Sequence, residues 1–216
     1  MLMILVEMNR LRLATVMATV IWGLTVGIGY LALQLHGASP GQGGRVVELW
    51  PDQSRIPLTG GRPTLVIAAH PLCPCTRATI AELTRVLTRC AGKVEVYILI
   101  LLPERAGHDW GPTDGLRRLG TMPGVHLIDD SGGEEAARFG ARTSGLVALY
   151  APDGRLHFRG GITGSRGHEG DNAGQQALLG LIQGNPSSLP CETPVFGCPL
   201  FPARSISAES PIPWKK

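Results

Sequence analysis

Hydrophobic positions follow three patterns along the chain. Residues 13–35 contain no charged side chain and are mostly apolar. Residues 64–69 and 94–102 are short, nearly continuous apolar runs, typical of strands buried on both faces of a sheet. Between these runs lie apolar residues at helical spacing, namely Ile80, Leu83, Val86 and Leu87. The pattern predicts a long apolar segment followed by an α/β domain.

The apolar segment 13–35 is long enough to cross a bilayer as a helix. Arg10 and Arg12 precede it and the next basic residue is Arg45, so the positive-inside rule predicts a cytoplasmic N-terminus, 1–12. A cleaved signal peptide is the alternative. The apolar region would be unusually long for a signal peptide. At the candidate cleavage site after Ala38, His36 occupies the third position back, where a small residue is expected. We therefore favour an uncleaved anchor. Either way the domain faces a side where disulfides persist.

The remaining chain divides into three predicted parts. Residues 36–45 are rich in glycine and predict a flexible tether. Residues 46–184 form the predicted domain, and 185–216 a Pro-rich tail. After the strand at 94–102 we expect a loop with a short helix, a strand at 125–128 and a helix at 134–139. A hairpin of 146–150 and 155–159 and a helix that Asp171 caps complete the expected order.

Length and composition fit one domain with appendages. The chain has 216 residues, of which 44% are hydrophobic and 17% are charged, and a formal net charge of +3. Basic residues form no stripe with interleaved aromatic residues, so nucleic-acid binding has no support.

The candidate chemistry lies in the motif His-Pro-Leu-Cys-Pro-Cys, residues 70–75. If Cys73 caps the following helix and Pro74 takes its first position, both Cys73 and Cys75 lie beside unpaired backbone N–H groups and the positive end of the helix dipole. These features favour the thiolate. The motif therefore predicts a thiol redox site or a soft-metal site.

The spacing of the two cysteines also bears on the chemistry. A disulfide between Cys73 and Cys75 closes a small, strained ring, which makes the bond more oxidising and favours disulfide exchange over strong reduction. Cys90, near the end of the same predicted helix, is interpreted as a small core residue.

Two further cysteines, Cys191 and Cys198, lie in the Pro-rich tail. They either form a local disulfide that staples the tail, or the tail returns to the active site and one of them resolves a disulfide with Cys73 or Cys75. The sequence leaves both interpretations open.

Two other function classes compete with redox chemistry. His70, Cys73 and Cys75 offer an imidazole and two sulfurs within six residues, a set suited to copper or zinc in a metal chaperone. A non-catalytic binding module is the third class. The redox interpretation itself requires no cofactor.

The element order and motifs resemble the thioredoxin-like superfamily, in particular the bacterial membrane-anchored RedB-type proteins. Five motifs carry the resemblance: residues 70–75, Thr-Ser-Gly at 143–145, Gly-Gly-Ile-Thr at 160–163, Arg-Gly-His-Glu-Gly-Asp-Asn at 166–172 and Thr-Pro-Val-Phe-Gly-Cys-Pro at 193–199. The resemblance implies a central mixed sheet flanked by helices, a periplasmic domain anchored in the bacterial inner membrane, and a redox role. Thr76 stands where the superfamily carries its second cysteine, and Ser144 where it carries a cis-proline.

A thioredoxin-like sheet would bring the loop 161–172 next to Cys73. There Arg166 or His168 is expected to lower a cysteine pKa and to transfer protons, with Glu169 orienting the imidazole; the alternative is a solvated loop. Thr76, Arg77 and Ser144 are further candidates for supporting the site.

The predicted function is thiol–disulfide exchange with protein thiols or disulfides outside the cytosol. Cys73 attacks a substrate disulfide, and Cys75 or a tail cysteine resolves the mixed disulfide.

Overall fold

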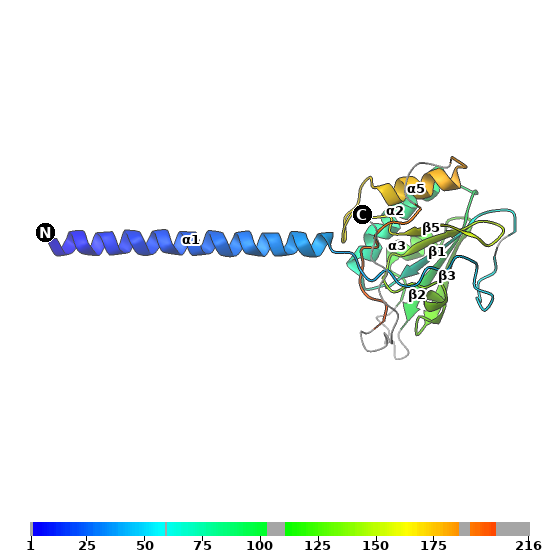
Figure 1. Cartoon of the computed structure of the whole chain (residues 1–216), viewed down its shortest axis with the longest axis horizontal. Coiled ribbons are helices and arrows are strands. Elements are labelled where there is room, and N and C mark those ends of the chain that lie inside the picture. Colours follow the sequence, from blue (N-terminus) through cyan, green and yellow to red (C-terminus); the bar gives the residue numbers. More distant parts are fainter. Residues whose placement is uncertain (1, 59, 103–110, 186–190, 202–216) are drawn as a thin grey trace. The chain divides into compact units, whose positions relative to one another are not determined.

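The computed structural model describes residues 2–58, 60–102, 111–185 and 191–201, with side chains from Glu7 onward. The chain divides into two units, 1–38 and 39–216 (Figure 1). The predicted tail is described only at 185 and 191–201, and the rest of it lies outside the described residues.

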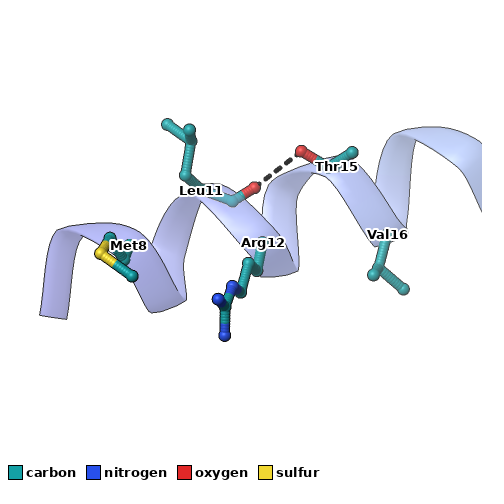
Figure 2. Close-up of a pocket in the computed structure, with 5 residues that line it drawn as sticks. All are labelled: Met8, Leu11, Arg12, Thr15 and Val16. Carbon is teal, nitrogen blue, oxygen red and sulfur yellow. Dashed lines mark hydrogen bonds between the residues drawn. The ribbon is translucent and has the colours of Figure 1, made fainter. Parts of the chain in front are cut away.

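The first unit is a single helix, α1 (Leu2–Ala38), which is longer than the predicted span. Its stretch Glu7–Ala38 is long and apolar enough to cross a membrane, and its side chains are exposed. Figure 2 shows the start of this helix, where the Thr15 hydroxyl donates to the Leu11 carbonyl over 2.9 Å. The helix thus satisfies that polar group internally, as an apolar environment requires.

The second unit is built on a five-stranded mixed sheet in the order β3-β2-β1-β4-β5. Its strands are β1 (Thr64–Ala69), β2 (Glu95–Leu102), β3 (Val125–Ser131), β4 (Val147–Tyr150) and β5 (Leu156–Gly160). Strands β1, β2 and β3 are parallel, whereas β4 is antiparallel to β1 and to β5. The predicted strands are therefore confirmed, with β3 three residues longer than expected.

Alternate residues of the apolar strands point to opposite faces, so both faces of the sheet are covered. Leu65 and Ile67 of β1 pack in one cluster with residues of α2 (Pro74–Arg89), α3 (Asp114–Leu119) and α5 (Ala173–Ile182). Val66 of β1 packs on the other face with α4 (Glu134–Arg138) and with two residues near the end of the described chain, Val195 and Leu200. Figure 1 shows α2 and α5 together on one side of the sheet.

The glycine-rich segment that follows α1 differs from the predicted flexible tether. The Gly41 N–H donates to the Val195 carbonyl over 2.8 Å, and the Arg159 guanidinium donates to the Gly43 carbonyl. A Cβ at Gly44 would collide with the carbonyl oxygen of Gly140. These glycines therefore allow close backbone packing against the domain.

The cap of the last helix also differs from the expectation. Asn172, not Asp171, is the N-cap of α5, and its side-chain oxygen accepts from the Gln175 N–H over 2.9 Å. The Asn172 amide also donates to the carbonyls of Ile162 and Gly170. A carboxylate could not donate these two hydrogen bonds, so the N-cap position in this loop requires an amide side chain.

Candidate thiol site at the start of helix α2

Cys73 lies at the junction between β1 and α2, where the motif predicted it. It is the N-cap of α2, with φ −83° and ψ 122°, and Pro74 follows at the first helical position. The Cys73 N–H donates to the His70 carbonyl, and the Thr76 N–H donates to the Cys73 carbonyl, both over 3.0 Å. Proline has no N–H to pair at this position and its φ suits the helix, so the sequence Cys-Pro starts the helix here.

The thiol of Cys73 is surrounded by hydrogen-bond donors. The side chain is only 4% exposed, and the Cys198 N–H points at its sulfur over 3.4 Å. Burial alone raises the pKa of this thiol. The Cys198 thiol and the N–H groups of Cys198, Thr76 and Cys75 outweigh burial, and the pKa of Cys73 is lowered. Cys73 is therefore more acidic than an ordinary thiol.

The neighbouring Cys75 has the opposite acid–base behaviour. It is also 4% exposed, and burial, followed by the charge of Cys73 and a hydrogen bond with it, raises the pKa of Cys75. The Gly167 N–H and the charge of Arg166 act in the other direction without reversing the shift. The motif thus holds one thiol whose pKa is lowered and one whose pKa is raised.

Thr76 and Ser144 form a buried polar link beneath the cysteines. The Ser144 hydroxyl oxygen accepts from the His70 N–H over 2.9 Å and lies 2.7 Å from the Thr76 hydroxyl. The Thr76 hydroxyl donates to the His70 carbonyl over 2.9 Å. This link ties the residue after β1, the first turn of α2 and the turn that precedes β4 together, so both residues fix the geometry of the Cys73 turn.

The loop 161–172 reaches the cysteines through Arg166 and Gly167. Arg166 donates to the Gly197 carbonyl over 2.6 Å and to the Ser39 carbonyl over 3.1 Å, and its charge acts on Cys75 and Cys198. Of the loop candidates, Arg166 is thus the one that the structure places at the thiols.

Three other candidates lie away from the cysteine sulfurs. His168 and Arg77 are exposed. Glu169 pairs with Arg85 of α2 over 3.3 Å, so its partner is not the predicted imidazole of His168. None of the three is among the groups that act on the thiol pKa values.

Glu82 is a buried carboxylate that sequence reasoning did not single out as part of the site. Its oxygens accept from the Gly170 N–H over 2.6 Å and from the Gln175 side chain over 2.7 Å, and it pairs with Arg85. It therefore holds the loop 161–172 against α2. The signal was available, since Glu82 lies beside Leu83 and three residues after Thr79 on the buried face of the helix.

The two tail cysteines occupy different places. Cys191 is exposed, and its carbonyl accepts from the Arg159 N–H of β5 over 2.9 Å, whereas Cys198 reaches Cys73. All five cysteines, these two included, are free thiols in the structure, and a disulfide between Cys191 and Cys198 stays a prediction. Cys90, the C-cap of α2, is 1% exposed and packs in the core, as interpreted from the sequence.

The metal alternative requires His70 to join the cysteine thiols. Burial lowers the pKa of His70, while its backbone N–H and carbonyl take part in the link to Ser144 and Thr76. Among the described residues, no three His, Cys, Asp or Glu side chains form a group that could hold a metal ion. Copper or zinc binding thus has no geometric support and stays a prediction.

The chain matches no family model and no curated protein. A solved structure of an uncharacterized conserved protein from Geobacillus kaustophilus is similar at 15% identity and a TM-score of 0.54, covering 77% of this chain and 93% of its own. A hypothetical protein from Sinorhizobium meliloti is similar at 18% identity and a TM-score of 0.52, covering 76% and 96%. Together with the strand order and directions, these matches decide the architecture. The fold is thioredoxin-like.

A secreted Mycobacterium tuberculosis disulfide oxidoreductase homologous to E. coli DsbE is more distantly similar. It has 17% identity and a TM-score of 0.42, and the match covers 58% of this chain and 83% of that one. At this level of similarity the chemistry has to be argued from the cysteines themselves.

Proposed function

We propose that this protein is a membrane-anchored thiol–disulfide oxidoreductase in which Cys73 is the nucleophile. The observation that carries the proposal is the position of Cys73 at the N-terminus of α2, where the Cys198 thiol and the N–H groups of Cys198, Thr76 and Cys75 together outweigh burial and lower the pKa of Cys73. A thiolate, not a thiol, attacks a disulfide. Cys73 is thus the cysteine of this motif that is ready to react.

In the proposed reaction, the Cys73 thiolate attacks one sulfur of a substrate disulfide. A bond forms between the two sulfurs, and the other substrate sulfur leaves as a thiolate that takes up a proton. A second thiol of the protein then attacks the mixed disulfide at Cys73. The substrate leaves as a dithiol, and the protein is left with an internal disulfide. Running in reverse, the same steps oxidise a substrate dithiol.

The proposed location is the bacterial inner membrane, with α1 as a single-pass anchor and the domain in the periplasm. The apolar stretch Glu7–Ala38 and the position of Arg10 and Arg12 before its uncharged part support this orientation. A compartment in which disulfides persist suits the reaction. We also propose that the protein is of the RedB type, on the strength of its five sequence motifs.

The test is the reaction of the reduced full chain, in detergent, with a small aromatic disulfide that releases a coloured thiolate. It uses a Cys191→Ser background, because Cys191 is exposed and would react by itself. Cys73→Ser should remove the fast phase of thiolate release, and Cys90→Ser, at the other end of the same helix, should keep it. A fast phase that survives Cys73→Ser would refute the proposal.

A further inference from the structure

The segment 191–201, here called the return segment, brings a third cysteine to the site. The Cys198 N–H points at the Cys73 sulfur over 3.4 Å, and the two side chains are hydrogen-bonded to each other. The two residues are 125 positions apart in the chain. The return segment therefore places Cys198 against the Cys73 sulfur, although nothing in the local sequence joins the two residues.

Backbone contacts fix Cys198 at this place. Its carbonyl accepts from the Ser144 N–H over 2.9 Å, and the Leu200 N–H donates to the Arg142 carbonyl over 2.9 Å. Gly197 makes the closest approach, since a Cβ there would collide with the Ser144 carbonyl oxygen. A proline at 144 would have no N–H to offer, so the departure from proline at this position suits a chain that binds its own return segment.

The alternatives to Cys198 are less well placed. Cys75 is also hydrogen-bonded to Cys73, but only one residue separates the two at the start of α2, so a bond between them closes a strained ring. Cys191 is in the same return segment but is exposed and bound to β5. Cys198 is the tail cysteine that contacts Cys73.

We infer that Cys198 is the resolving cysteine, and that the internal disulfide of the oxidised protein joins Cys73 to Cys198. This rests on the proposed function of Cys73. The Cys198 sulfur, as thiolate, attacks the Cys73 sulfur of the mixed disulfide. The Cys73–Cys198 bond forms, the bond to the substrate breaks, and the substrate sulfur leaves as a thiolate that takes up a proton.

The pKa of Cys198 depends on whether Cys73 is a thiolate or a mixed disulfide. Burial, together with the hydrogen bond to Cys73 and the charge of Cys73, raises the pKa of Cys198 to about 12. Cys198 therefore stays protonated while Cys73 is a thiolate. Once Cys73 is a neutral mixed disulfide, the hydrogen bond to its thiolate and its charge no longer raise the pKa of Cys198, so this pKa falls. Burial, the largest cause, still raises it, and the Arg166 charge still favours the Cys198 thiolate. Arg166 is thus a positioning residue, which also holds the Gly197 carbonyl.

The experiment treats the reduced full chain in detergent with oxidised glutathione and follows the glutathione bound to each cysteine over time by peptide mass spectrometry. Cys198→Ser should hold glutathione on Cys73, with a lifetime roughly a hundredfold longer than in the unsubstituted protein, since an intramolecular thiol acts at a high effective concentration. Cys191→Ser is the matched control from the same segment and should clear glutathione from Cys73 at the unsubstituted rate. Peptide mapping of the oxidised, unsubstituted protein should link Cys73 to Cys198.

Two results would overturn the inference: a Cys73–Cys75 link in the unsubstituted protein, or clearance in Cys198→Ser as fast as in Cys191→Ser. The map of the unsubstituted protein needs no variant to fold. Failure of the proposed function gives a different result, because then Cys73 takes up no glutathione in any variant.

Discussion

Helix α2 carries a cysteine at each end, and the two ends have opposite chemistry. Cys73 is its N-cap and Cys90 its C-cap, and their exposed fractions are 4% and 1%. Burial raises the pKa of Cys90, with the Lys93 charge opposing it, whereas the pKa of Cys73 is lowered. Burial acts on both thiols, so it does not explain the difference.

The difference lies in the hydrogen-bond donors around each thiol, since the Cys198 thiol and N–H of the return segment lower the pKa of Cys73 most, followed by the N–H groups at the start of α2. The N-terminus has unpaired N–H groups that stabilise a negative charge, and the C-terminus has carbonyls that do not. The Cys198 N–H donates to the Cys73 sulfur over 3.4 Å, and the N–H groups of Thr76 and Cys75 also lower the pKa of Cys73. The donors that the helix start and the return segment supply, and not depth in the core, therefore separate the reactive cysteine from the structural one.

The largest expected effect is on alkylation of the two cysteines by iodoacetamide in the folded full chain. Because its pKa is lowered, the Cys73 thiolate persists to lower pH, and its rate falls only as the pH falls through that value. Cys90 becomes a thiolate only above the pKa of an ordinary thiol. At about pH 7 Cys73 should react at least ~10-fold faster, as read by peptide mass spectrometry. Equal rates and equal pH midpoints would remove the basis of the comparison.

The chemistry of the N-terminal end of α2 was predictable because its signals are local. An apolar strand, Cys73-Pro74 and an amphipathic run stand next to each other in the sequence, and together they fix the cap and the first turn. The order of strands and helices could also be predicted from the apolar pattern, because strands and helices space their apolar residues differently.

The rest of the site depends on contacts between distant segments. Cys191 and Cys198 lie in equally Pro-rich surroundings, and only the backbone pairing of residues 143 and 199 decides which one reaches Cys73. A glycine-rich run such as 41–45 fits both a flexible tether and close backbone packing. The close approach to the Gly140 carbonyl, far away in the sequence, makes it the second. The two partners of each of these contacts lie far apart in the sequence, so no local pattern predicts them.

A smaller effect is expected from Gly197→Ala, which tests the N–H that the return segment contributes. The added Cβ would collide with the Ser144 carbonyl and push Cys198 away from Cys73. With that donor withdrawn, the alkylation midpoint of Cys73 should rise toward that of an ordinary thiol. Gly164→Ala is the control, because its Cβ meets only the Asn172 Cβ at 3.8 Å. An unchanged midpoint in Gly197→Ala would mean that α2 alone sets the pKa of Cys73.

The smallest expected effect concerns the C-terminal end of α2. Cys90 packs in the core cluster with Leu87 and Val94, so Cys90→Ala removes a buried sulfur and should cost about 1 kcal/mol in the free energy of unfolding. The midpoint of urea unfolding of the full chain in detergent measures this loss, and the exposed Cys191→Ala should change it by less than about 0.5 kcal/mol. Disulfide exchange should be unaltered, because Cys90 contributes to packing and contacts no other thiol of the site. Slower exchange at unchanged stability would instead give Cys90 a part in the chemistry, and the hydrogen-bond donors around Cys73 would no longer separate the two cysteines.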